Sequence, residues 1–319
     1  TIASFLGFEF DECELSELAD FQFESRGQAQ EERHTKGAAA DVHGLLVAAH
    51  REGVIEEIAC SEGGGCEPLV RYKFSHDKVQ EALYDSLPVP ESERLHRVIG
   101  LHQLRREDHA ERVFNIADHL NKAHRLLQSS HQDRSLVVKA NFDAAKKAIS
   151  RSAYHSSVEY LQLALNAQDP KTKWKEDYEL TLEMTSTLLE MFQASETATD
   201  AKVEIVVDEV VRNARCAADK LPAMCSKIRL VGGEGRYKES IKYGIDVART
   251  VGEKIPKKPN LLHILPMLLK ARRRLGRLSD DDILNLPFVE EEKFQQLLQF
   301  YGLMSSYTLI SGQDLLGMY

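Results

Sequence analysis

From about residue 111 to its end, the chain repeats apolar residues at the spacing of an α-helix. Apolar positions three and four residues apart form one stripe along a helix, whereas a strand alternates every second residue. A chain with this pattern over two thirds of its length is expected to be mainly α-helical. The predicted helical segments are 111–127, 133–170, 174–193, 203–221, 227–256 and 260–287.

Two of these segments share one arrangement of small and aromatic residues. Its members are Tyr154, Ser157, Leu161, Ala164 and Leu165 in the first, and Gly235, Tyr237, Ser240, Gly244 and Ala248 in the second. Small residues let antiparallel helices approach closely and stack on a neighbouring pair, as in tetratricopeptide repeats. The two tyrosines lie 83 residues apart, which fits two units of about 40 residues, against roughly 34 in the standard repeat. We predict an irregular TPR-like α-helical solenoid.

The first hundred residues have a different pattern. A helix over 40–53 ends at Gly53, and strands follow from residue 55 and over 69–74. Glycine, serine and proline between the strands predict a β-hairpin with a flexible tip at 61–68. A helix over 75–87 comes next. Two helices, a small β-hairpin and a further helix are the layout of a winged-helix domain.

Composition and charge narrow the function classes. The net charge of −9 argues against general affinity for nucleic acid or an anionic membrane. The helices at 40–54 and 75–87 carry more acidic than basic residues, so neither resembles a DNA-recognition helix. The chain has no secretory signal and no apolar run near the roughly 18 residues of a membrane span. We expect a cytoplasmic protein, and a piece of a longer one because it opens on Thr1.

The basic run at 270–277 leaves alternatives open. A membrane-surface helix or an acidic partner would account for it. The interpretation we favour is a solvated basic face beyond an apolar stripe, and Ser279 is predicted to cap the acidic turn that follows.

Catalytic and metal-binding signatures are missing from the sequence. The glycine-rich stretch at 230–240 lacks GxxxxGK[ST], and Gly235 is explained by a turn between helices. His119 and His124 are five residues apart, about 140° around a helix, which does not suit a metal pair. The twelve histidines are interpreted as mostly surface residues and the five cysteines as free thiols. We expect no active site in this chain alone.

Ser75 and His76 are the candidate site. Ser75 is predicted to cap the helix that follows, and His76 to occupy its first position. A helix start exposes amide groups and a partial positive charge, so it suits a phosphate, and an imidazole there adds one donor. The alternative is that His76 bonds a backbone carbonyl and fixes the hairpin to the helix. Physical reasoning alone favours this structural role.

The chain resembles a known family. The stretches FLGFEFDECELSELADF, AAHREGVI, RYKFSHDKVQEALYDSLP and ESERLHRVIGLHQL resemble the winged-helix end of STAND/AAA-type ATPase modules in multidomain sensor kinases. VFNIADHLNKAHRLL, WKEDYELTLEM and GRYKESIKYGIDVARTVGEKIP resemble the helical repeats that follow it. The resemblance implies a winged-helix end over 1–106 and TPR-like repeats over 107–319.

The resemblance also implies a function. The histidine of an MHD-like motif senses the phosphates of bound ADP in that family, and Ser75, His76 and Asp77 match its position. ATP or ADP, with magnesium, would be bound mainly by an upstream domain. That domain, the protein's own histidine or serine/threonine kinase domains and a protein on the repeats are the implied partners. Two alternatives stay open: a non-catalytic scaffold, and an arm of a STAND-class transcriptional activator.

Overall fold

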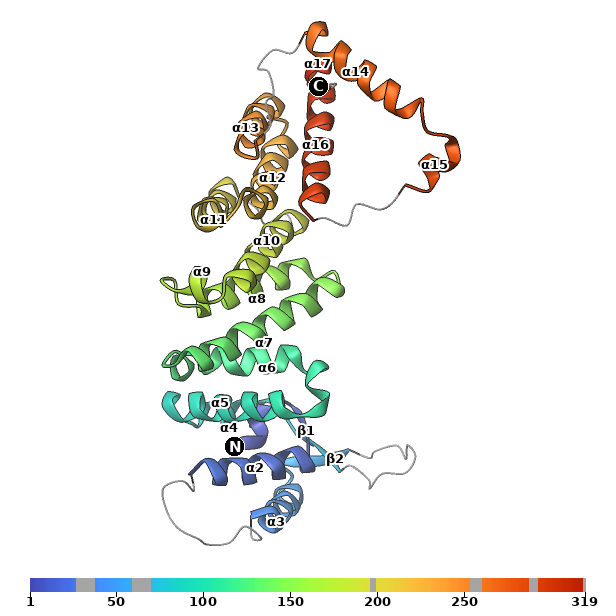
Figure 1. The fold of residues 1–319 in the computed structure, drawn as a ribbon. Coiled ribbons are helices and arrows are strands. Elements are labelled where there is room, and N and C mark those ends of the chain that lie inside the picture. The colour runs from blue at the N-terminus through green and yellow to red at the C-terminus, as the bar shows by residue number, and fades with distance from the viewer. Residues whose placement is uncertain (27–37, 59–69, 196–198, 253–259, 287–291, 318–319) are drawn as a thin grey trace. The chain divides into compact units, whose positions relative to one another are not determined.

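The protein is mainly helical with a small three-stranded sheet (Figure 1). The structure, a computed structural model, describes residues 1–26, 38–58, 70–195, 199–252, 260–286 and 292–317. Two compact units are present: residues 1–147 with 166–168, and residues 148–165 with 169–319. The domain boundary predicted after residue 106 stays a prediction.

The N-terminal part of the first unit is built around the sheet. Strand β3 is central and pairs antiparallel with both others, with Phe10 opposite Tyr72 and Ile55 opposite Phe74. The side chains of these four residues are buried together with Leu46 of α3. The elements are α1 (Ile2–Leu6), β1 (Glu9–Asp11), α2 (Glu12–Arg26), α3 (Ala38–Arg51), β2 (Ile55–Ile58), β3 (Arg71–Phe74), α4 (Asp77–Asp85) and α5 (Val89–Arg105).

The helix, its stop and the two hairpin strands were predicted and are confirmed. Helix α3 ends at Gly53, whose φ of 72° lies in the left-handed region that glycine adopts without strain. The Gly53 amide donates to the His50 carbonyl, and the Val54 amide donates to the Ala49 carbonyl. This pair of bonds is a Schellman motif and turns the chain directly into β2. The predicted tip at 61–68 lies outside the described residues.

Helical elements complete the first unit. They are η2 (Glu107–Ala110), α6 (Val113–Lys122), η3 (His124–Leu127) and the part of α7 (His131–Ser150) up to residue 147. The segment predicted as one helix over 111–127 is therefore divided at Ala123. Side-chain amides of Asn121 and Asn141 exchange two hydrogen bonds of 2.9 and 2.7 Å and join α6 to α7.

The second unit holds the later helices. They are α8 (Tyr154–Ala167), α9 (Lys173–Glu176), α10 (Tyr178–Ala194), α11 (Asp200–Asn213), α12 (Ala217–Gly233), α13 (Tyr237–Thr250), α14 (Leu261–Leu275), α15 (Asp280–Leu284), α16 (Glu292–Ile310) and α17 (Asp314–Gly317). The predicted helix over 203–221 is broken, because Ala214 and Cys216 adopt extended backbone between α11 and α12. Ser279 caps α15 as predicted, in a reciprocal capping box with Asp282.

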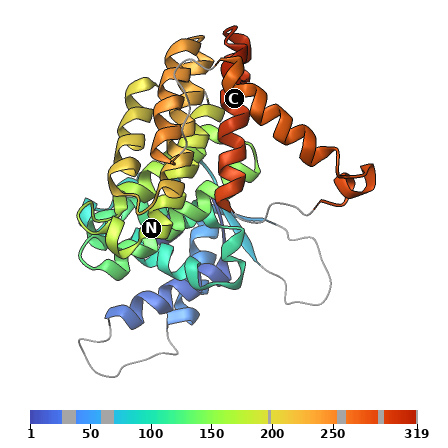
Figure 2. The same cartoon turned by 45° about the horizontal axis from the view of Figure 1, so that its top comes forward.

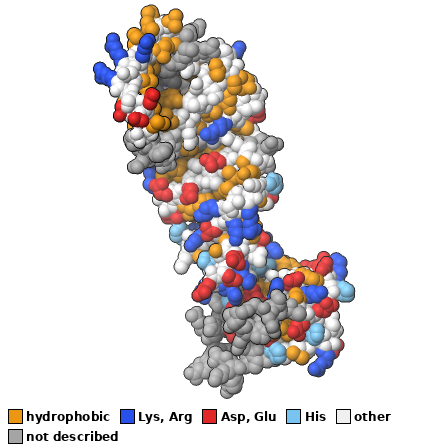
Figure 3. Space-filling view, turned by 90° about the vertical axis from the view of Figure 1, so that its right-hand side faces the viewer, with side chains coloured by type: hydrophobic (Ala, Val, Ile, Leu, Met, Phe, Trp, Pro, Cys, Tyr) orange, Lys and Arg blue, Asp and Glu red, His pale blue; other side chains and the backbone are white. Residues whose placement is uncertain are grey.

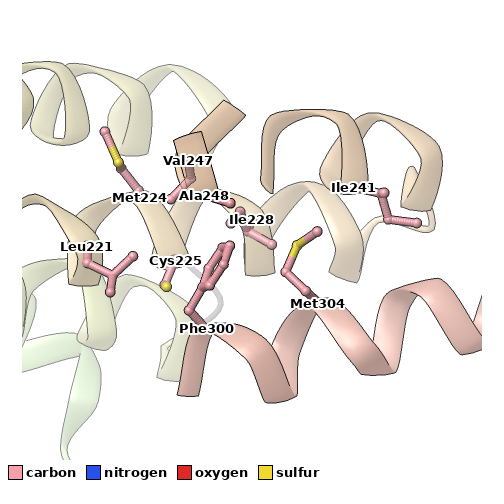
Figure 4. Close-up of a cluster of buried hydrophobic side chains, with 9 residues drawn as sticks. All are labelled: Leu221, Met224, Cys225, Ile228, Ile241, Val247, Ala248, Phe300 and Met304. Atoms are coloured by element: carbon pink, nitrogen blue, oxygen red, sulfur yellow. The ribbon is translucent and has the colours of Figure 1, made fainter. Parts of the chain in front are cut away.

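Helices α12, α13 and α16 pack around one apolar core (Figure 1, Figure 2). Gly244 of α13 allows a close approach, since a Cβ atom there would lie 2.0 Å from the Met304 sulfur. Gly244 and Ala248, two of the small residues predicted to lie at contacts between helices, do lie at such a contact. Figure 4 shows the buried side chains: Leu221, Met224, Cys225, Ile228, Ile241, Val247, Ala248, Phe300 and Met304.

The turn geometry described for Gly53 recurs at three places where one helix is followed by another. Ser152, Gly235 and Gly312 each have a positive φ, of 59°, 80° and 70°. Each of their amides donates to the carbonyl three residues back, and the next amide donates to the carbonyl five residues back. The turn at Gly235 was predicted, and the turn at Gly312 was not. A small residue follows each turn after five residues: Ser157, Ser240 and Gly317.

Candidate functional site

Ser75 lies between β3 and α4 and does not cap the helix, so the predicted cap is wrong. Its hydroxyl donates to the carbonyl of Val54 at 3.0 Å, and its amide donates to the same oxygen at 3.1 Å. Both bonds fasten the end of β3 to the residue before β2. The hydroxyl is thus committed to the hairpin, and α4 begins one residue later than predicted.

His76 is the N-cap residue of α4 rather than its first helical residue. Its backbone is extended, with φ −148° and ψ 142°, and its carbonyl accepts the first helical bond, from the Val79 amide at 2.9 Å. The imidazole is exposed. Among the residues that the structure describes, no group forms a hydrogen bond with this ring, so the structural role considered for it, a bond to a backbone carbonyl, is not seen there.

The surroundings of His76 define what it can do. Val79 and Leu83 on the following turns pack against the core of the sheet, so the helix that carries the ring is anchored. The start of the helix and the imidazole favour an anionic group, whereas the exposed Asp77 disfavours one. Lys78 forms an ion pair with Glu81. The exposed ring can therefore act as a hydrogen-bond donor to an anionic group.

A buried histidine pair was missed by the sequence analysis. His96 of α5 and His119 of α6 are 2% and 9% exposed, and their Nδ1 atoms lie 2.8 Å apart. The hydroxyl of Tyr84 is 2.9 Å from Nε2 of His96. The apolar spacing could have revealed His119, because it shares one helical stripe with Ile116 and Leu120.

The geometry of this pair requires at least one neutral ring. One Nδ1 atom must donate while the other accepts, and two imidazolium rings would place two N–H groups against each other. Burial lowers the pKa of His96 to about 4, helped by the positive charge of Lys122. Burial also lowers the pKa of His119, together with the charges of His96 and Lys122.

Stability is therefore expected to fall with pH below the ordinary histidine pKa of 6.5. The pKa values of both histidines are lower in the folded than in the unfolded chain, so the unfolded chain binds protons first as the pH falls. The pair's contribution to folding stability is therefore complete above pH 6.5 and is lost towards about pH 4. The free energy of unfolding should drop by up to about 1.4 kcal/mol per pH unit for each proton taken up. Urea unfolding between pH 7.5 and 5 measures this slope.

The double variant His96→Phe/His119→Leu should flatten that dependence. Replacing the exposed histidines His109 and His155 with alanine should leave it unchanged. A slope that survives removal of the buried pair would place its origin elsewhere.

A second buried polar cluster lies close by in sequence. The Glu14 side chain, 5% exposed, accepts hydrogen bonds from Arg112 at 2.8 Å and from Gln103 at 2.9 Å. Burial alone would lower the pKa of Arg112, but bonds and charges of Glu14 and Asp108 outweigh it and raise that pKa. The cluster joins α2, α5 and the start of α6, so its role is to hold these helices together.

We searched the described part of the chain for metal-ligand clusters, disulfides and membrane-spanning helices. No three His, Cys, Asp or Glu side chains gather there as metal ligands would. Cys13, Cys216 and Cys225 are free thiols there. None of the helices described combines the length and apolar character needed to span a bilayer.

Comparisons with protein-family models, with curated proteins and with solved structures find no match in any of the three.

Proposed function

We propose that the chain is a regulatory and protein-interaction region of a multidomain ATP-dependent signalling protein of the sensor-kinase type. Its N-terminal part would sense the nucleotide held by a preceding domain. Its helical pairs would bind a partner protein or the protein's own kinase domains. The observation that carries the proposal is the exposed His76 imidazole at the start of an anchored helix.

The arrangement around the sheet supports the winged-helix part of the proposal. Helices α2 and α3 precede the β2–β3 pair, and α4 follows it. The short β1 adds a third strand beside β3. Ser75 locks the hairpin to the helix start through Val54, so a displacement of the hairpin would move His76 as well. This coupling is what a nucleotide sensor needs to pass on a change.

The recurring turn supports the repeat part of the proposal. Ser152, Gly235 and Gly312 end three helices with the same backbone bonds, and each is followed by another helix. Ser240, five residues after the second turn, is fully buried, and its hydroxyl donates to the Ile228 carbonyl at 2.9 Å. Stacked helix pairs of this kind present extended surfaces that bind proteins.

In this mechanism ADP favours a resting state in which His76 donates to a phosphate oxygen. Replacing ADP by ATP would shift the population to a state without that contact. A hydrogen bond to a charged group contributes about 1.5–3 kcal/mol, which corresponds to at least about tenfold in affinity. The nucleotide pocket and its magnesium would belong to the preceding domain.

Replacing His76 with alanine in the full-length protein should weaken ADP binding at least about tenfold and raise basal activity. Calorimetric titration with ADP measures the first effect. His155→Ala, which removes an exposed histidine of α8, should bind ADP as the unchanged protein does.

An unchanged ADP affinity in His76→Ala would exclude the sensing role. A full-length protein that binds no nucleotide would instead favour the second candidate, a non-catalytic scaffold. The three turns that join helices support that candidate too, because stacked helix pairs bind proteins without a nucleotide.

A further inference from the structure

Helix α14 presents apolar side chains to the solvent. Only Ile264 is buried on this helix, at 1% exposure. The stripe at i, i+1, i+4, i+7 and i+8 forms one face. It consists of Leu261, Leu262, Leu265, Leu268 and Leu269, which are 48–80% exposed. The apolar stripe that the sequence predicted is thus solvent-exposed along with the basic face.

Positive charge is concentrated beside these leucines. Residues 261–278 contain five of the chain's 41 lysine and arginine residues and no acidic residue, although the whole chain carries −9. Four of these cations line an open groove with Pro266 and Leu269: Lys270, Arg273, Arg274 and Arg277. The net charge of the whole chain argues against binding to an anionic surface, but this helix is locally basic.

The helix is well formed at both ends. Asn260 and His263 make a capping box at its start. Its last turn carries Arg272, Arg273 and Arg274, which complement the negative end of the helix dipole. In the space-filling view, hydrophobic and basic side chains gather over α14, and the acidic side chains over α15 follow them (Figure 3).

We propose that α14 binds the surface of an anionic lipid bilayer and lies along it, with its leucines in the interfacial region. Exposed leucines on one face and a cluster of four or more cations are the features by which amphipathic helices bind acidic lipids. Arg272, which lies among the leucines, has a side chain long enough to reach the headgroups.

The residue types favour lipid over a protein partner. Arginine suits both kinds of partner, but the other side chains in which binding energy between proteins is concentrated are tryptophan and tyrosine, and leucine is under-represented there. The exposed face of α14 has leucines and no aromatic residue. A bilayer, by contrast, takes up leucine side chains without a shaped pocket.

Vesicle sedimentation of the 319-residue chain tests the proposal. Binding is expected to phosphatidylcholine vesicles that contain about one third phosphatidylserine, and not to phosphatidylcholine alone. It should weaken steeply between about 0.1 and 1 M salt, because the Debye length shortens to about 3 Å.

Two charge-reversal variants separate α14 from the rest of the surface. Arg273→Glu/Arg274→Glu should lower the affinity for anionic vesicles more than about tenfold. Lys238→Glu/Lys242→Glu reverses two exposed charges on α13 and should change it less than about twofold.

The apolar face is tested in the same way. Leu265→Ser/Leu268→Ser should also abolish most binding, whereas Leu309→Ser/Ile310→Ser, at exposed positions of α16, should not. All four changes are at exposed residues, and circular dichroism should show an unchanged helix content. No binding to anionic vesicles, equal binding to neutral ones, or equal losses in the α13 and α14 variants overturns the proposal. If the chain binds an acidic peptide but no vesicles, the proposal is also overturned, and α14 would be assigned to a protein partner.

Discussion

The Phe300→Ala variant is expected to lose about 3–5 kcal/mol of unfolding free energy in the second unit. The ring is fully buried and lies among side chains of α12 and α13, with Cys225 and Ile228 beside it (Figure 4). Truncation removes the burial of the ring and leaves a cavity that close-packed helices fill only in part. Helices α13 and α16 are already in close contact at Gly244, so they cannot move much closer together to fill the cavity.

Phe294→Ala provides the matched control. The residue lies on the same helix, α16, and its side chain is 52% exposed. Its replacement should change stability by less than about 1 kcal/mol. Urea unfolding followed by circular dichroism measures both, and a loss in stability should move the midpoint without changing the slope. Equal losses in the two variants would contradict the packing shown around Phe300.

Removing Arg112 is expected to have the second-largest effect, a loss of about 3 kcal/mol in Arg112→Leu. Among the described residues, the buried carboxylate of Glu14 then keeps a hydrogen bond from Gln103 and a weaker interaction with the charge of Arg106. Breaking a buried ion pair typically costs about 3–5 kcal/mol, and the lower end applies because the Arg112 side chain is 26% exposed and the charge of Arg106 remains near Glu14.

A double-mutant cycle separates charge from packing. Glu14→Leu/Arg112→Leu should recover more than half of the loss, because an apolar pair needs no compensation for charge. Arg125→Ala, which breaks the 3.7 Å contact of the exposed Arg125 with the half-buried Glu93, should cost about 1 kcal/mol or less. If the double variant is less stable than Arg112→Leu, the lost energy came from packing and the cluster is not held by charge.

The sequence was sufficient where local signals agreed. Apolar periodicity and Gly53 predicted α3 and its stop, and two β-rich runs predicted β2 and β3. The turn at Gly235 followed from its place between two helical patterns. Each of these features is encoded within a few residues, so no knowledge of distant contacts was needed.

Other features depend on contacts that the sequence pattern does not show. The three-residue β1 is too short for periodicity and forms because β3 offers it a partner. Ser75 has the residue type of a cap, but the Val54 carbonyl takes its hydroxyl. The apolar spacing indicates that His119 is buried, but its pairing with His96, 23 residues away, arises only because α5 packs on α6. The exposure of α14 likewise required the positions of its neighbours.

The central claim, a histidine that senses a nucleotide held elsewhere, is tested most directly by titrating ADP into two proteins side by side. One is the 319-residue chain, and the other is the full-length protein. We expect tight, magnesium-dependent binding by the full-length protein and weak or no binding by the chain alone. Equal affinity of the two would contradict it, because the nucleotide would then be bound by the helices and sheet described above.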